Sequence, residues 1–222
     1  TACATAGIVV GVIGQTGLGL EFTRWVLSLA DGHLWAALGL ITLAALILGM
    51  GLPVTAAYIL LSVMTAPALE GMGIPLLVGH LVIFWLSQIS NITPPVALAA
   101  FAAAGIAGAS PMRASIQAVK LASGFFLIPL MMIQSELIWT DGIALVDHLR
   151  SILATLALMA AFAFAAEGLI FCALQRVWRV VFVLAIGLLL YHDATIQWAG
   201  CALVGVGIFI NYRQSRTHHL AV

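Results

Sequence analysis

Two short stretches of small and polar residues interrupt the longest apolar runs of this sequence, and they hold the side chains best suited to chemistry. Residues 49–53 read Gly-Met-Gly-Leu-Pro, with Thr55 just beyond, and residues 90–95 read Ser-Asn-Ile-Thr-Pro-Pro. Hydroxyl and amide oxygens can coordinate a cation together with freed backbone carbonyls, without any carboxylate. The N-terminus of a helix that restarts after a break favours an anionic group. The pattern therefore predicts an anion site, with a cation site as a second candidate.

Both stretches predict interrupted helices. Proline removes a backbone donor and clashes with the preceding turn, and the residue before a proline is pushed out of the helical region. Thr93 and Pro94 each precede a proline, and Gly49 and Gly51 add backbone freedom before Pro53. Opened backbone is costly in lipid unless protein or water satisfies its polar groups. We therefore expect discontinuous helices or re-entrant hairpins around a polar site, with proline-kinked helices or short surface loops as the alternative.

Composition places these breaks in a membrane. The chain has 222 residues, of which 64% are hydrophobic and 7% charged, and its mean hydropathy is +1.18. A soluble domain carries about 25% charged residues, and a soluble fold of this size could not hide so much apolar surface. The sequence predicts an all-α polytopic membrane protein in a lipid bilayer. Zero net charge and the lack of a basic stripe argue against nucleic acid as a partner.

Charged residues delimit the expected spans, each of which needs about 20 apolar residues. Single helices are predicted at 1–20, 114–135, 152–175, 177–192 and 195–212. The charge-free runs 32–69 and 71–112 are too long for one crossing, and each is expected to divide at its polar stretch. The composition becomes plainer near residue 140. We therefore expect a domain of residues 1–142 and a three-helix extension at 143–222.

Basic residues near helix ends predict the orientation, because short cytoplasmic loops are enriched in Lys and Arg. The crossings after residue 150 gather four arginines on one side of the membrane: Arg176, Arg179, Arg213 and Arg216. The other side receives Arg150 together with three acidic residues: Asp141, Asp147 and Asp193. The sequence therefore predicts a cytoplasmic C-terminus and an external loop at 136–150.

Enzymatic chemistry is poorly supported. The chain has no His-Glu-x-x-His motif, no Gly-x-Ser-x-Gly motif and no second carboxylate deep in a predicted span. Glu167 lies inside the predicted helix 152–175, where an ionisable group is a functional hypothesis by default. It could instead snorkel or stay protonated against a neighbouring helix. His80 is either a proton relay or a capped polar residue near an interface, and we favour the second interpretation.

The sequence around both breaks resembles one transporter family. Residues 49–59 (Gly-Met-Gly-Leu-Pro-Val-Thr-Ala-Ala-Tyr-Ile) are similar to the second-repeat motif of the large permease subunit of TRAP (tripartite ATP-independent periplasmic) transporters. Residues 90–101 (Ser-Asn-Ile-Thr-Pro-Pro-Val-Ala-Leu-Ala-Ala-Phe), followed by Ala-Gly-Ile-Ala-Gly at 104–108, resemble the other strong signature of that family. The likeness covers about residues 1–142. Its form resembles the TAXI type, in which the small and large membrane subunits are fused, and residues 151–212 resemble its C-terminal extension more weakly.

The resemblance implies an elevator-type secondary transporter of the bacterial inner membrane. A mobile domain of two inverted repeats would carry an organic acid, such as a C4-dicarboxylate, received from a periplasmic TAXI-type substrate-binding protein. A sodium or proton gradient would drive this symport, and no other cofactor is implied. The chain opens with Thr1 inside an apolar run, so we expect the N-terminal part of the fused permease, with the first repeat, to be a further partner.

The resemblance also implies roles for residues of both breaks. In the first break, the candidates for binding a cation are Gly49, Gly51 and Thr55. In the second, the candidates for lining a substrate or cation site are Ser90, Asn91, Thr93 and Pro94. Val54 departs from the family, which often has Thr there, so Thr55 would supply the hydroxyl. A different elevator family, such as a sodium–dicarboxylate symporter, and a scaffolding subunit without a site of its own are the alternatives.

Overall fold

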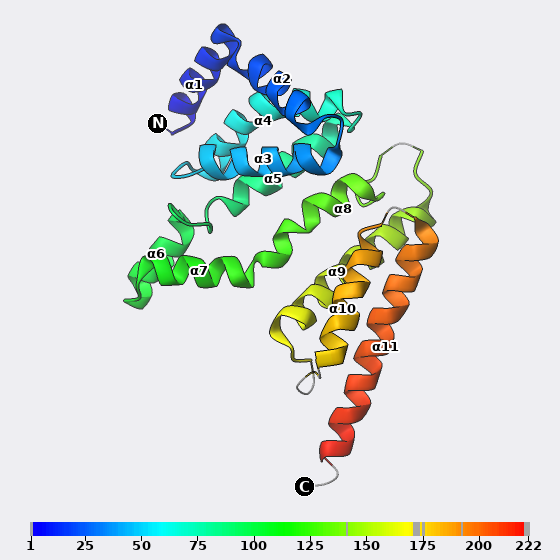
Figure 1. The fold of residues 1–222 in the computed structure, drawn as a ribbon. Helices are drawn as coiled ribbons and strands as arrows, with labels where there is room; N and C mark the ends of the chain where they lie inside the picture. The colour runs from blue at the N-terminus through cyan, green and yellow to red at the C-terminus, as the bar shows by residue number, and fades with distance from the viewer. Residues whose placement is uncertain (1, 141, 171–173, 175, 192, 220–222) are drawn as a thin grey trace. The chain divides into compact units, whose positions relative to one another are not determined.

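The computed structural model (Figure 1) describes residues 2–140, 142–170, 174, 176–191 and 193–219, and the regular elements of this part are all helices. Side chains are described throughout it except at 2–6, 9, 10 and 216–219. Asp141 and the Arg216 side chain, both used above to predict orientation, lie outside the described part. The all-α prediction is confirmed.

The chain folds as two compact units, Thr1–Pro129 and Leu130–Val222. The elements of the first unit are α1 (Ala2–Thr16), α2 (Leu18–Ala30), α3 (Leu34–Leu48), α4 (Val54–Gly71), α5 (Leu76–Ile89), α6 (Leu98–Ala107), α7 (Pro111–Leu121) and the 3-10 helix η1 (Ser123–Phe126). Helix α8 (Ile128–Gln134) runs into the second unit, which holds α9 (Leu145–Glu167), α10 (Arg176–Leu189) and α11 (Ala194–His219). The boundary predicted from sequence, between residues 142 and 143, divides the repeat that resembles the family from the C-terminal extension. It is a different kind of boundary from that of the compact units, and it stays a prediction.

Helix α4 is the centre of the first unit, where it packs on α1, α2, α3 and α5. Its buried side includes small residues such as Ala56, Ala57 and Ala68, which are at most 6% exposed. Small residues let apolar helices approach closely, and dispersion contacts then replace the missing hydrophobic effect in lipid. Helix α5 also has a small residue where it packs on α4: a Cβ added at Gly79 would lie 3.6 Å from the Leu69 side chain of α4.

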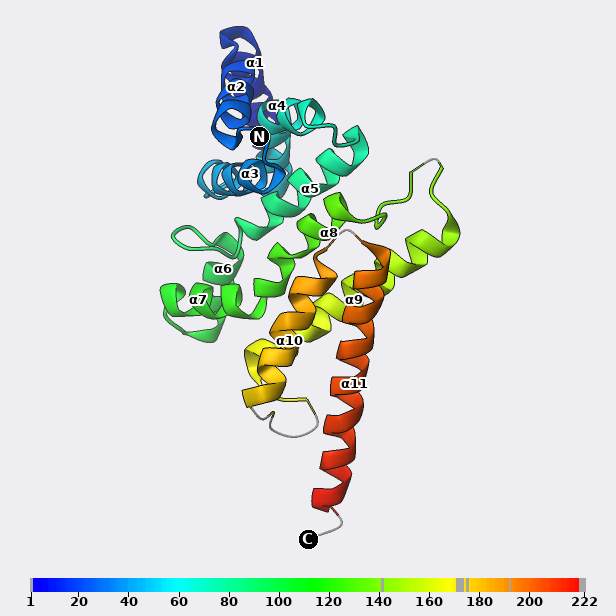
Figure 2. The same cartoon turned by 45° about the vertical axis from the view of Figure 1, so that its right-hand side comes forward.

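Three helices form the second unit, and α9, α10 and α11 each pack on the other two (Figure 2). Gly200 and Gly207 lie seven residues apart on α11, so they share one face of that helix. A Cβ added at Gly200 would fall 2.7 Å from Leu189 Cγ, and one at Gly207 would fall 2.8 Å from Phe182 Cζ. The large buried side chains of α10 therefore pack directly against the backbone of α11 at these two glycines.

The described part contains three helices long and apolar enough to cross a membrane: Val54–Gly71, Leu145–Glu167 and Ala194–Ser215. A fourth span is formed if Pro111–Leu121 and Ser123–Gln134, bent by 58° at their junction, count as one. Helices α3, α5 and α6 are apolar but shorter, with 15, 14 and 10 residues. A polytopic membrane protein with interrupted helices is the class that the sequence predicted.

Two predicted single helices are in fact divided. The helix expected at 1–20 ends at Thr16, because Gly17 adopts a left-handed φ of 70° and α2 starts in a new direction. The helix expected at 114–135 bends between α7 and α8. There Ser123 Oγ donates to Lys120 O at 2.6 Å, and the chain tightens into η1 before α8 begins at Ile128. Gly17 lies in a charge-free run, and Lys120 before the second bend lies inside the predicted helix, so the charge pattern marked neither break.

The helix predicted at 152–175 is also placed differently. It begins seven residues earlier, at Leu145, and ends at Glu167, because Gly168 takes the left-handed conformation (φ 68°) that terminates helices. Glu167 is therefore exposed in the last turn rather than deep inside a span. The Arg179 guanidinium lies against Gly168 and donates to the Glu167 carbonyl at 3.3 Å.

A buried arginine ties the segment after α8 to α9. Arg150 is 8% exposed, and its Nη2 donates to Glu136 Oε2 at 2.7 Å, while Ser151 Oγ donates to the same oxygen at 3.2 Å. The His148 ring nitrogen Nδ1 lies 2.8 Å from the Glu136 carbonyl oxygen. Partial burial raises the pKa of the Glu136 carboxyl, but its own backbone amide, Ser151 and Arg150 together hold that pKa below the usual 4.5.

Replacing this carboxylate, by Glu136→Gln, is expected to lower the free energy of unfolding by about 1–2 kcal/mol at pH 7, because a buried guanidinium loses its nearer charged partner and keeps only Asp147 Oδ1, at 3.6 Å. A depressed pKa contributes stability above pH 4.5 that is lost as the pH falls through the folded-state pKa, so wild type and variant should converge in acid. Thermal unfolding in detergent, followed by circular dichroism, measures both effects.

The matched control is Glu21→Gln, which removes the exposed ion pair of Glu21 with Arg24 (2.6 Å). Exposed pairs contribute little, so this variant should unfold like wild type. An equal loss in both variants would contradict the anchoring role of Glu136.

Candidate functional site

The first break is a tight reversal between α3 and α4. Gly49 stays helical and donates to Ala45 O at 2.9 Å, and Leu52 N–H donates to Gly49 O at 3.3 Å. Gly51 takes a φ of 75°, which non-glycine residues rarely adopt. Pro53 immediately precedes α4, and its carbonyl accepts the first helical bond from Ala57 N–H at 3.0 Å. Gly51 and Pro53 thus place the break where the sequence predicted it.

The second break is held onto the end of α5 by its own side chains. Ser90 Oγ donates to Ser87 O at 2.7 Å, and Thr93 Oγ1 donates to Ile89 O at 2.8 Å. Asn91 Nδ2 donates to Ser87 O at 3.3 Å, and its backbone carbonyl accepts Ala99 N–H at 3.1 Å across the break. Carbonyls that a helix end leaves unpaired are therefore satisfied locally, as opened backbone in a membrane requires.

The two breaks meet at Gly49 and Ser90. A Cβ added at Gly49 would lie 2.6 Å from Ser90 Oγ and 2.8 Å from Ser90 Cβ, and only 2.5 Å from Ala45 O. Ser90 is 1% exposed at this contact. A second approach joins the same loops, because a Cβ at Gly51 would lie 3.6 Å from Val96 Cγ1. Residues 41 positions apart in sequence thus form one crossing point.

Not every predicted candidate shares this contact. Thr55 is exposed in the first turn of α4, and among the described residues no hydrogen bond joins its hydroxyl to the second break. Asn91, Thr93 and Pro94 are half-buried and follow Ser90 directly. The structure therefore brings Gly49 and Gly51 into contact with the second break, whereas Thr55 lies outside this contact. The binding roles of all seven candidates stay predictions.

Two helix ends meet at this crossing point, because α3 ends at Leu48 and α5 ends at Ile89. Helix α4 begins at Val54, five residues after Gly49, and α6 begins at Leu98, eight residues after Ser90. The first amides of α4 and α6 lack intrahelical acceptors and carry partial positive charge, while the last carbonyls of α3 and α5 carry partial negative charge. Such a junction can attract an anion and a cation at neighbouring points without a charged side chain. Among the described residues, no three His, Cys, Asp or Glu side chains gather as metal ligands would.

Two interactions of α4 and α5 with other helices were not assigned from sequence. Tyr58, one turn beyond Thr55 on α4, has its hydroxyl 3.0 Å from His80 Nδ1 on α5. Trp85 Nε1 donates to Phe125 O of η1 at 3.0 Å. The first interaction joins residues 22 positions apart in sequence, and the second joins residues 40 positions apart. Local sequence patterns therefore could not predict either pair.

The fold and the junction define a class: a polytopic α-helical membrane protein built around paired helix breaks. A family model, described as "Tripartite ATP-independent periplasmic transporter, DctM component", matches residues 1–139, and the chain belongs to this family. The matched residues are more than half of the chain and include both breaks. No curated protein and no solved structure matches it.

The contact of the two breaks predicts that Gly49→Ala is disruptive. The new methyl group must displace Ser90 and the α3 backbone, and overpacking of this kind costs about 1–3 kcal/mol. Loss of the folded fraction on heating, measured by fluorescence-detected size-exclusion chromatography, should therefore occur at a lower temperature than in wild type.

Gly39→Ala is the matched control, because Gly39 lies in the same helix and nothing stands within 4 Å of its added Cβ. Alanine is the better helix former, so this variant should be as stable as wild type or slightly more so. Adding Ser90→Gly to Gly49→Ala should restore part of the loss. Equal behaviour of the two alanine variants would contradict the close packing of the breaks.

Proposed function

We propose that this TRAP permease chain forms part of the transport site of a secondary active uptake system for organic acids, C4-dicarboxylates among them. Membership of the DctM family shows that the chain is a TRAP transporter permease component. The observation that supports the proposed site is the contact of Gly49 with Ser90, which brings the end of α3 against the end of α5. Helix ends around broken segments are how many secondary transporters hold anionic substrates and coupling cations.

The proposed division of labour follows the polarity of the junction. The N-terminal amides of α4 and α6 would attract the carboxylate of the substrate. Carbonyls of α3, with Gly49, Gly51 and Thr55, would face a coupling sodium ion, and Ser90, Asn91, Thr93 and Pro94 would line the substrate or cation site. A coupling proton would need a titratable group instead. Ser90 and Thr93 already donate their hydroxyl protons to α5 carbonyls, so their oxygens present lone pairs.

The proposed partners follow from the TAXI resemblance of the two motifs. A periplasmic TAXI-type binding protein would deliver the substrate, and the N-terminal part of a fused permease would supply the first repeat. The two parts would form an elevator-type transport domain. Residues 143–222, whose described part contains the separate α9–α11 bundle, would be the C-terminal extension that stabilises the assembly.

Substitution of the two break residues tests the proposed site. Thr55→Ala and Asn91→Ala should each lower cation-dependent uptake about ten- to a hundredfold, because a charge-assisted ligand contributes about 1.5–3 kcal/mol. The measurement is uptake of radiolabelled organic acids into proteoliposomes that hold the complete permease and its binding protein, with and without a sodium or proton gradient.

Thr42→Ala is the control for a lost threonine hydroxyl, since Thr42 Oγ1 donates only to Leu38 O within α3 (2.7 Å). Its uptake should match wild type. Unchanged cation dependence in both Thr55→Ala and Asn91→Ala would refute the assignment of the site.

We further propose an inner-membrane location with a cytoplasmic C-terminus. Arg176 and Arg179 lie in the first turn of α10, and Arg213 lies near the end of α11. Arg150, Asp147 and Asp193 belong to the opposite ends of the helices of this bundle. Short cytoplasmic loops carry the positive excess, so the arginine-rich ends would face the cytoplasm.

Fusion reporters test this orientation. Green fluorescent protein joined to the C-terminus should fluoresce, and alkaline phosphatase joined there should be inactive. Alkaline phosphatase inserted after Gly142 should be active. Phosphatase activity at the C-terminus would reverse the proposed orientation.

A further inference from the structure

Helix α7 carries two basic side chains without a counter-charge. Arg113 and Lys120 are the only Asp, Glu, Lys or Arg residues between Glu70 and Glu136. Both are exposed, and neither makes an ion pair or a side-chain hydrogen bond with the described residues. They lie seven residues apart, which is close to two helical turns, so they share one face of the helix. The two cations are therefore available to bind an anionic group.

An apolar stripe runs beside these two cations. Met112 and Ile116 lie one turn apart on α7, and they are 47% and 44% exposed. Ile116 follows Arg113 by three residues and precedes Lys120 by four, so these side chains are neighbours on the helix surface. The buried face is a different one, where Ser115 is 0% exposed and its hydroxyl donates to Met112 O at 2.9 Å. The exposed side of α7 is therefore amphipathic.

Helix α7 is too short to cross a bilayer and does not run straight into the next segment. Gly108, with a φ of 62°, ends α6, and Pro111 is the first residue of α7. The 11 residues of α7 span about 16 Å, whereas the hydrocarbon core is about 30 Å thick. The segment Ser123–Gln134 is bent by 58° from α7. Among the described elements of the first unit, α7 contacts only α6 and η1, which leaves its amphipathic side uncovered there (Figures 1 and 2).

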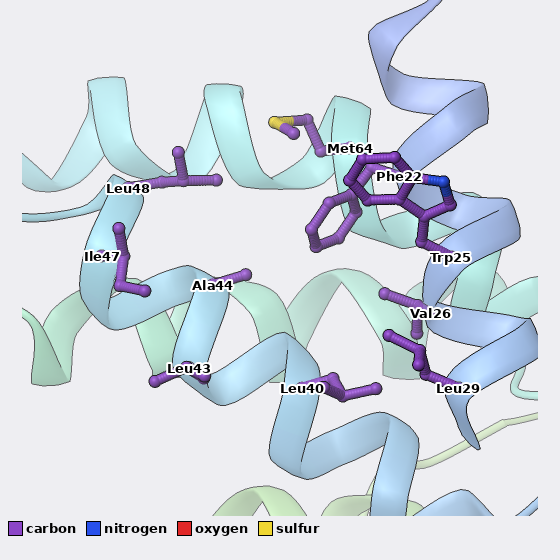
Figure 3. A pocket seen from close by; sticks show the side chains of 10 residues that line it. All are labelled: Phe22, Trp25, Val26, Leu29, Leu40, Leu43, Ala44, Ile47, Leu48 and Met64. Atoms are coloured by element: carbon purple, nitrogen blue, oxygen red, sulfur yellow. The ribbon is translucent and has the colours of Figure 1, made fainter.

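A second apolar surface of the unit lacks an unpaired arginine or lysine. A groove of about 310 Å³ lies between α2, α3 and α4, and no charged, hydroxyl or amide side chain lines it (Figure 3). Trp25 and Leu29 of α2 are 66% and 70% exposed there. Arg24, the only Lys or Arg before Arg113, is held by Glu21 at 2.6 Å, so its charge is compensated. The groove can contact the acyl chains of any lipid, whereas α7 can also distinguish head groups by their charge.

We propose that α7 lies along the membrane surface and binds anionic phospholipid head groups through Arg113 and Lys120. The stripe of Met112 and Ile116 enters the acyl region, as the apolar face of an interfacial helix does. The long stems of the two basic side chains lie along the apolar surface and bring their charges to the lipid phosphates, which a guanidinium can bind with two parallel hydrogen bonds.

The side of the membrane favours the same partner. Short cytoplasmic loops are enriched in Lys and Arg, and the cytoplasmic leaflet is the one whose surface is made negative by anionic lipids. A basic amphipathic helix and an anionic lipid are therefore expected to meet there. This lipid site goes beyond the proposed transport function and does not depend on it.

Native mass spectrometry of the complete permease tests the proposal, with phosphatidylglycerol and phosphatidylcholine of identical acyl chains as the probes. Wild type should bind phosphatidylglycerol more tightly, and inorganic phosphate should not displace it, because the apolar stripe holds the acyl chains. Arg113→Gln combined with Lys120→Gln should raise the apparent dissociation constant for phosphatidylglycerol about ten- to thirtyfold, as expected for two basic residues at an anionic surface. Binding of phosphatidylcholine should not change.

Two variants serve as controls. Arg113→Lys combined with Lys120→Arg keeps both charges and should keep the preference for phosphatidylglycerol. Arg24→Gln removes an exposed arginine that is already paired with Glu21, so this variant should bind both lipids like wild type. Size-exclusion chromatography of each variant shows whether it is folded, and substitutions at exposed positions rarely unfold a protein.

Four results would overturn the proposal. Equal affinity of wild type and the double glutamine variant for phosphatidylglycerol would show that the two cations bind no head group. An equal loss in Arg24→Gln would show a general effect of charge. Displacement by inorganic phosphate would assign the two cations to a soluble anion. Unchanged lipid binding with a loss of self-association on size-exclusion chromatography would make α7 a protein contact.

Discussion

The first unit depends on one close contact, between Gly49 and Ser90. Two helix breaks can lie against each other only where at least one backbone carries no side chain, and the space for a Cβ at Gly49 is already filled by Ser90 and Ala45. Burying one break on the other removes opened backbone from lipid, where each unsatisfied group would cost several kcal/mol.

The polar side chains of the junction serve the backbone first. Ser90, Asn91 and Thr93 each donate to a carbonyl in the last turn of α5, which keeps the end of that helix satisfied. Their donors are thereby directed away from a ligand, while the lone pairs of their oxygens stay free to accept. This arrangement suits a cation better than an anion at the hydroxyls, and it leaves anion attraction to the amides at the starts of α4 and α6. A structural role and the proposed site role are therefore compatible in the same residues.

Local chemistry explains which parts of the fold could be predicted. The Gly-Leu-Pro and Thr-Pro-Pro sequences cannot continue a helix, so the breaks at 49–53 and 90–95 were placed correctly from sequence. The turn at Gly17 was missed because Gly7, Gly11 and Gly14 occur in the helix just before it, and nothing in the sequence distinguishes a left-handed glycine from a helical one. The end of α9 was missed for the same reason at Gly168. Contacts such as Trp85 with Phe125 depend on tertiary packing, which periodicity does not encode.

The corrected position of Glu167 changes how the two coupling cations can be distinguished. An exposed residue in the last turn of α9, beside Arg179, gives no reason for a proton-carrying role within a span. In the first unit, His80 is half-buried and hydrogen-bonded to Tyr58, which lies one turn from Thr55 on the helix that leaves the junction. Sodium coordination would draw on hydroxyl and carbonyl oxygens at the breaks, whereas proton coupling would draw on the imidazole between α4 and α5. The two mechanisms therefore use different residues of one helix pair, and substitution at Asn91 and at His80 can separate them.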